Sequence, residues 1–107
     1  MNSAIKEALD LLKSRLAERF GSDIELTLFG STARGESREF SDIDVLVLFP
    51  GEVDISLEER IFDAAFEVGL EYDIVFGVIV YSHDFWETPR AKVMPLYDNI
   101  QQEGIRI

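Results

Sequence analysis

The chain has 107 residues, of which 47% are hydrophobic and 29% charged, and its 21 acidic and 10 basic residues give a net charge of −11. This length and apolar content predict one globular domain over residues 1–107 and exclude a disordered tail. The absence of cysteine excludes disulfides, thiolate metal sites and a cysteine nucleophile. No apolar run nears the roughly 20 residues that span a bilayer, and the first residues lack a signal-peptide pattern, so we expect a cytoplasmic protein.

Hydrophobic spacing and turn residues predict alternating helices and strands. In chain order we expect a helix over 3–19, a strand over 24–29, a short helix from 31, a strand over 43–49, a helix from 56 to 68 or 69, a strand over 72–81, a helical turn over 83–87 and a helix over 95–103. Gly21 and Gly104 are expected to end the first and last helices. This order predicts a small α/β (α+β) sandwich with helices packed on a mixed sheet.

The turn after the first predicted strand has the composition of a phosphate-binding turn. Gly30 has no Cβ, so a phosphate can approach its backbone closely. Ser31 adds a hydroxyl at the point where a following helix offers N–H groups to an anion. Arg34, expected in the first turn of that short helix, can bind phosphate through two hydrogen bonds, or it can pair with Glu36 or Glu39 at the surface. Both interpretations of Arg34 are open.

Two aspartates mark the start of the second predicted strand. Asp42 and Asp44 are two residues apart, so both carboxylates project from one face of the strand, with Cα atoms roughly 7 Å apart. Oxygen ligands at this spacing suit Mg²⁺, which takes one or two carboxylates and completes its shell with water and phosphate. An ordinary polar loop would explain Asp42, but it does not explain a carboxylate inside the apolar run 43–49, because buried charges need a partner or a metal. The Gly30-Ser31 turn and the two aspartates together indicate phosphoryl or nucleotidyl transfer.

The Gly30-Ser31 pair, a spacer of ten residues and Asp42-x-Asp44 resemble the signature of the nucleotidyltransferase superfamily that includes DNA polymerase beta. The run Arg34-Gly35-Glu36 is most similar to the minimal nucleotidyltransferases, which are stand-alone prokaryotic catalytic cores, many of them encoded beside a helical HEPN protein. The resemblance implies a polymerase-beta-like core that moves a nucleoside monophosphate, with ATP as the expected donor, onto a hydroxyl. It assigns the triphosphate to the Gly-Ser turn and two Mg²⁺ ions to the aspartates.

The superfamily also has a third carboxylate on a later strand, beside the aspartate pair. Asp73 is the candidate, because it stands at the start of the third predicted strand inside an apolar run. In the resemblance this third acid completes the two-metal site beside the attacking hydroxyl. Glu71 lies on the same face by strand alternation and competes for the role. A solvated residue at the start of an edge strand is the structural alternative for Asp73.

The charge of the chain limits its partners. Nucleic-acid binding needs clustered bases to neutralise phosphates, so DNA or RNA is disfavoured for this domain alone, whereas a nucleotide carried with Mg²⁺ is compatible. The resemblance suggests an acceptor hydroxyl on a HEPN-type toxin, with the chain as its antitoxin. An alternative is a non-catalytic antitoxin that neutralises the partner by binding. An aminoglycoside nucleotidyltransferase is less favoured, because such relatives carry an extra helical region for the drug.

Overall fold

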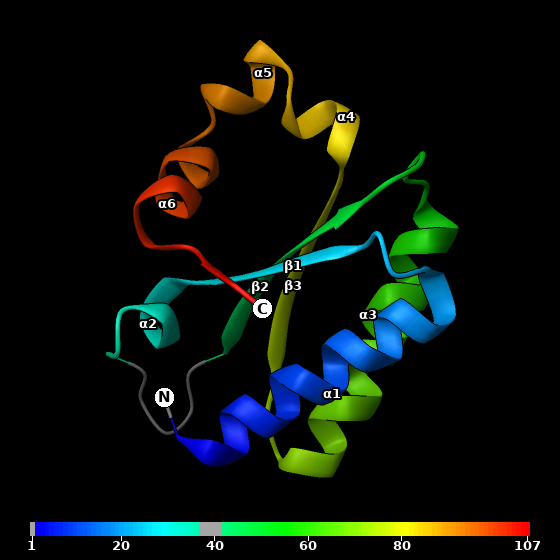
Figure 1. The fold of residues 1–107 in the computed structure, drawn as a ribbon, viewed down its shortest axis with the longest axis vertical. Coiled ribbons are helices and arrows are strands. Elements are labelled where there is room, and N and C mark those ends of the chain that lie inside the picture. Colours follow the sequence, from blue (N-terminus) through cyan, green and yellow to red (C-terminus); the bar gives the residue numbers. More distant parts are fainter. Residues whose placement is uncertain (1, 37–41) are drawn as a thin grey trace.

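The structure, a computed structural model, describes residues 2–36 and 42–107, which form a four-stranded sheet with helices on both faces (Figure 1). The strands are β1 (Glu25–Phe29), β2 (Ile43–Phe49), β3 (Phe76–Ser82) and β4 (Ile105–Arg106). The helices are α1 (Ser3–Phe20), α2 (Gly30–Ala33), α3 (Ile55–Tyr72), α4 (His83–Trp86), α5 (Pro89–Lys92) and α6 (Pro95–Glu103). None of the helices in these ranges is long and apolar enough to cross a membrane.

The sheet has the strand order β3-β2-β1-β4 and is mixed, as expected. β2 is antiparallel to β1 and parallel to β3, and β4 is antiparallel to β1. A parallel pair needs a long crossover, which α3 supplies between β2 and β3. The predicted α/β sandwich with a mixed sheet is therefore confirmed.

Strand alternation in β2 divides the core into two layers. Ile43, Val45 and Val47 face α1 and α3, which lie side by side on one face of the sheet (Figure 1). Leu46 and Leu48 face the other way and pack in a smaller cluster under α4–α6 with Trp86. Because Asp42 and Asp44 alternate with the first set, their carboxylates belong to the α4–α6 side of the sheet.

α1 begins at residue 3 as predicted, and α3 begins at residue 55, one residue before its predicted start. Asn2 caps α1 by accepting a hydrogen bond from the N–H of Ile5 at 2.8 Å. Asp54 caps α3 in the same way, from the N–H of Leu57 at 2.8 Å. Ser56 therefore lies inside α3. Asparagine and aspartate are among the residues most favoured at the capping position.

The boundary between α3 and β3 is the largest departure from the prediction. α3 continues to Tyr72, Asp73 caps it in the left-handed region at φ 55°, and β3 begins only at Phe76. The predicted helix end at residue 68 or 69 and the strand start at residue 72 are wrong. Gly69 does not stop the helix; it is buried where a Cβ would collide with the carbonyl oxygen of Ile74. The glycine permits close packing of the helix against the segment that follows it.

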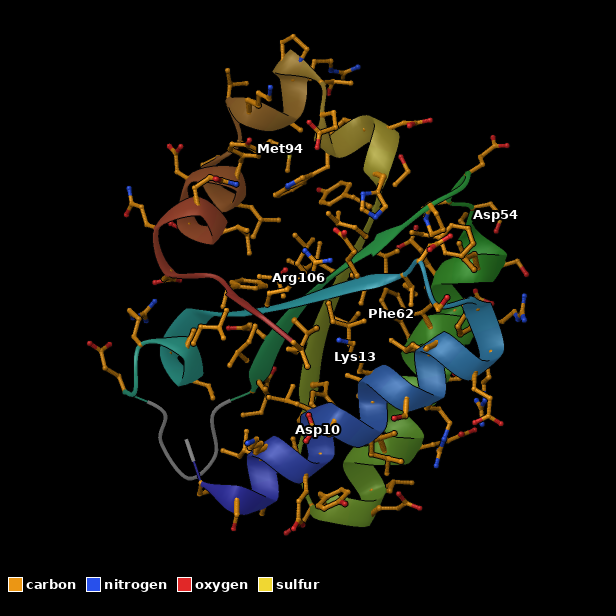
Figure 2. The ribbon with its side chains drawn as sticks, in the orientation of Figure 1. Asp10, Lys13, Asp54, Phe62, Met94 and Arg106 are labelled. Carbon is orange, nitrogen blue, oxygen red and sulfur yellow. The ribbon has the colours of Figure 1, made fainter. Side chains whose placement is uncertain are left out.

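The C-terminal segment matches the predicted helix over 95–103 and adds two elements that the sequence did not indicate, α5 and β4. Thr88 caps α5, and its Oγ1 accepts from the N–H of Ala91 at 3.3 Å. β4 is only two residues long and pairs with Thr27 and Leu28 of β1. Lys13 of α1 secures the end of this segment by donating to the backbone oxygen of Ile107 at 2.6 Å (Figure 2).

Candidate active site

Strand pairing brings the Gly30-Ser31 turn and Asp44 together. Phe29, the last residue of β1, lies opposite Asp44 of β2, so the turn that follows begins beside the Asp44 carboxylate. On its other side Asp44 lies opposite Gly77 of β3. The two parts of the sequence motif, ten residues apart in the chain, are therefore neighbours in the sheet.

The Asp44 carboxylate lies between two residues that have no side chain. A Cβ on Gly30 would collide with Asp44 Oδ2, and Gly30 also has φ 75°, which other residues rarely adopt. A Cβ on Gly77 would lie 2.9 Å from Asp44 Oδ1, closer than real Cβ atoms approach. Both glycines therefore make room for this carboxylate.

Asp42 and Asp44 form a pair of like charges. Asp42 is exposed. The position that a Cβ on Gly77 would take lies 3.9 Å from Asp42 Oδ2 and 2.9 Å from Asp44 Oδ1, so both carboxylates lie beside Gly77. Burial raises the pKa of Asp44, and the carboxylate of Asp42 raises it further. Two oxygen-donor groups that repel each other at the edge of solvent fit a divalent cation, since Mg²⁺ needs only one or two carboxylates.

The structure adds Glu103, the last residue of α6, to this site. Its Oε1 accepts a hydrogen bond from the Gly30 N–H at 3.1 Å, and both of its oxygens accept from Arg34 Nη1, at 3.1 and 2.9 Å. The guanidinium of Arg34 lowers the pKa of Glu103. Sequence reasoning missed Glu103 because its partners are 73 and 69 residues away and nothing local marks it.

The sequence predicted Arg34 in the first turn of the short helix. In the structure Arg34 follows α2 as its C-cap instead. Besides Glu103 it pairs with Glu36, Nε to Oε2 at 3.0 Å, so the surface ion pair weighed from the sequence is present. These contacts use Nε and Nη1 of a group that has five N–H donors. A role in phosphate binding therefore remains a prediction for Arg34.

Asp73 does not join the aspartate pair. It caps α3 and lines a hollow between α3 and β3, while the β3 residue beside Asp44 is Gly77. Glu71 lies within α3, so the strand alternation that made it a competitor does not exist. Among residues 2–36 and 42–107, no three His, Cys, Asp or Glu side chains are grouped so as to hold a metal ion. The expected strand position of Asp73 is wrong because α3 extends to Tyr72.

Replacing Gly30 by alanine tests the space around Asp44. We expect Gly30→Ala to destabilise the fold by about 2 kcal/mol or more, from the left-handed backbone and the collision with Asp44. Gly35→Ala is a matched control, because Gly35 has φ 74° but no atom within 4 Å of its Cβ position. Urea unfolding of both variants measures the loss of unfolding free energy and separates backbone strain from the collision. Equal losses of unfolding free energy in the two variants would contradict the packing of Asp44 against Gly30.

Replacing Glu103 by glutamine tests the contact with Arg34 and Gly30. The pKa of Glu103 is lowered in the folded state, so its contribution to stability is present above its ordinary value of 4.5 and is lost as pH falls through the folded-state pKa. We expect Glu103→Gln to unfold at lower urea concentration than the wild type at pH 7, and at nearly the same concentration at pH 3. Glu71→Gln, on the exposed surface of α3, is the control and should show no such pH-dependent difference.

Asp44 should have the opposite pH dependence. Its pKa is raised in the folded state, so the ionised carboxylate lowers stability above that pKa, and the loss disappears as pH falls toward the ordinary value of 3.8. In metal-free buffer we expect Asp44→Asn to melt at a higher temperature than the wild type at pH 7, with the gain shrinking toward pH 3.5. A lower melting temperature at pH 7 would show that Asp44 is a structural acid.

Comparisons with known proteins show the family of the chain. The model of the nucleotidyltransferase domain family matches residues 9–105. A Methanocaldococcus jannaschii protein, named as a candidate protein adenylyltransferase, is 37% identical over 101 residues, covering 94% of this chain and 91% of that protein. The protein adenylyltransferase MntA of Thermococcus cleftensis is 49% identical over 45 residues, which are 42% of this chain and 44% of MntA.

Solved structures show the same fold. One described as a candidate minimal nucleotidyltransferase is 27% identical with a TM-score of 0.62, covering 100% of this chain and 97% of that one. One of a toxin–antitoxin with AMP-PNP is 18% identical with a TM-score of 0.59, covering 98% of this chain and 72% of that one. The resemblance inferred from the Gly-Ser and Asp-x-Asp motif is confirmed. The chain belongs to the nucleotidyltransferase domain family and is a nucleotidyltransferase.

Proposed function

We propose that this protein is a Mg²⁺-dependent adenylyltransferase that transfers AMP from ATP to a hydroxyl of a HEPN-type toxin partner, and so acts as its antitoxin. The observation that carries the proposal is the position of Asp42 and Asp44 beside the Gly30-Ser31 turn. A cation-binding pair next to a phosphate-binding turn is the arrangement that nucleotidyl transfer needs, because the reaction asks the protein mainly for positioning and charge stabilisation.

The names of similar proteins support the choice of AMP and of a protein acceptor. MntA of Thermococcus is named as a protein adenylyltransferase, and the Methanocaldococcus relative is named as a candidate for that activity. Two structures with this fold, at 18% and 16% identity, come from toxin–antitoxin pairs, and one of them contains AMP-PNP. The net charge of −11 agrees with a protein acceptor, because this domain alone repels a free polyanion.

Each residue of the site has a defined task in this proposal. Asp42 and Asp44 would hold the Mg²⁺ ions, which when bound neutralise the triphosphate and stabilise the attacking and leaving oxygens. Gly30 leaves the space that the Asp44 carboxylate occupies, and Ser31 and Arg34 would donate hydrogen bonds to the phosphates. The acceptor oxygen bonds to the α-phosphorus, the bond from that phosphorus to the bridging oxygen breaks, and pyrophosphate leaves while the hydroxyl proton passes to water. Asp73 has no task in this arrangement.

Labelling with α-³²P-ATP and Mg²⁺ tests the proposal. The protein encoded by the neighbouring gene, tRNA and an aminoglycoside are offered in parallel as acceptors. We expect label on the neighbouring protein. Asp42→Asn and Asp44→Asn should reduce the labelling rate by about a hundredfold or more, because each variant loses a group that stabilises the transition state. Asp73→Asn is the matched control and, at a saturating concentration of the neighbouring protein, should keep the wild-type rate, since Asp73 caps α3 away from the pair.

Three results would contradict parts of the proposal. Efficient labelling of tRNA by the domain alone would show that the charge argument against nucleic acid is wrong. Loss of activity in Asp73→Asn would restore Asp73 as the third carboxylate. Neutralisation of the toxin by Asp44→Asn, without any label on it, would show an antitoxin that works by binding.

A further inference from the structure

A stripe of apolar side chains on the outside of α3 is exposed. Phe62, Phe66 and Leu70 are 40%, 67% and 68% exposed, and they follow one another at intervals of four residues, so they form one row along the helix. The core side of the same helix is occupied by other residues, among them Ile61 and Val68, which are fully buried. α3 therefore has a second apolar face that the fold does not use.

This stripe borders a hollow of about 620 Å³ between α3 and β3. The hollow is lined by Phe62, Phe66 and Leu70 from α3 and by apolar residues that lead into and along β3, including Val75, which is 64% exposed. Of the described residues with large exposed apolar side chains, most gather at α3 and the edge strand β3. Figure 2 shows Phe62 on α3. Contiguous apolar patches of this kind mark interaction sites.

The neighbouring strand β3 is an unprotected sheet edge. It is outermost in the sheet, and within residues 2–36 and 42–107 no strand pairs with its outer side. The seven residues Phe76–Ser82 contain no charge and no proline, the two devices that commonly prevent a sheet edge from associating. A helix or loop laid over such an edge is another way to protect it.

The charges around the hollow indicate which kind of molecule it can bind. Among its lining residues Asp63 and Asp73 are acidic and none is basic. Two copies of this face would bring these carboxylates together between chains that each carry −11, so a second copy is a poor occupant. An apolar helix with basic flanks matches both features of this face. Its apolar side chains can pack on the row of α3, because residues spaced four apart form the ridges on which helices pack. Its basic flanks can pair with the acidic border.

We infer that the hollow between α3 and β3, with the row Phe62, Phe66 and Leu70, docks an amphipathic, basic-flanked helix of the partner protein. This inference rests on the proposed function, which supplies the partner. The docking face is formed by the α3 side of the sheet, whereas Asp42 and Asp44 belong to the α4–α6 side. Binding of the partner and chemistry on it are thereby assigned to separate surfaces.

The test compares Phe66→Glu with Ile55→Glu in binding to the protein encoded by the neighbouring gene, measured by calorimetry. Both residues are on α3, are exposed to a similar degree (67% and 74%) and gain the same charge, but only Phe66 lines the hollow. We expect Phe66→Glu to weaken the complex by about tenfold or more and Ile55→Glu to bind as the wild type does. Both variants should keep the wild-type melting temperature, because neither side chain is in the core. Asp63→Asn should weaken binding slightly, and less so as salt rises.

Separate outcomes distinguish this inference from the proposed function. A complex that survives Phe66→Glu overturns the docking face, even if α-³²P label still reaches the partner and is lost in Asp44→Asn. A complex that is lost in Phe66→Glu, with no label transferred by the wild type, supports the docking face and contradicts the transferase role. A wild-type dimer that Phe66→Glu dissociates, or no complex of the wild type with the neighbouring protein, overturns the inference.

Discussion

The candidate site depends on one constraint, which is the packing of the Asp44 carboxylate between Gly30 and Gly77. The register of three neighbouring strands, with Phe29, Asp44 and Gly77 in one row, sets this position. A half-buried carboxylate near the start of an apolar strand is destabilising unless something compensates for its burial, and the raised pKa of Asp44 reflects that cost. Because Gly30 and Gly77 have no Cβ atoms, the oxygens of Asp44 have room to lie beside Asp42, where the two carboxylates could share a cation.

Most of the fold was predictable from the sequence, because the long elements carry their own signal. The apolar run of β2 and the spacing of Leu9, Leu12 and Leu16 in α1 agree with the structure. The failures lie where tertiary contacts decide. Gly69 looks like a helix stop but is a packing position, and β4 is too short to be indicated by any pattern without its partner β1.

The candidate site was predictable only where its residues lie close together in the chain. Gly30, Ser31, Asp42 and Asp44 belong to one motif, and the structure brings the turn and the aspartates together. Asp73 was assigned by analogy to a strand that begins three residues later, so it does not reach the pair. Glu103 had no local signal, because only the folded chain brings α6 to the Gly30 amide.

The contact between Glu103 and Gly30 also makes the candidate site depend on the C-terminal helix α6. The two residues are separated by 73 positions, so their contact closes a large loop, and closing a large loop costs more conformational entropy than closing a short one. During synthesis, a chain that has left the ribosome only as far as β3 contains the turn and both aspartates but lacks the carboxylate that orients Arg34. The candidate site is therefore complete only after α6 has folded back onto α2.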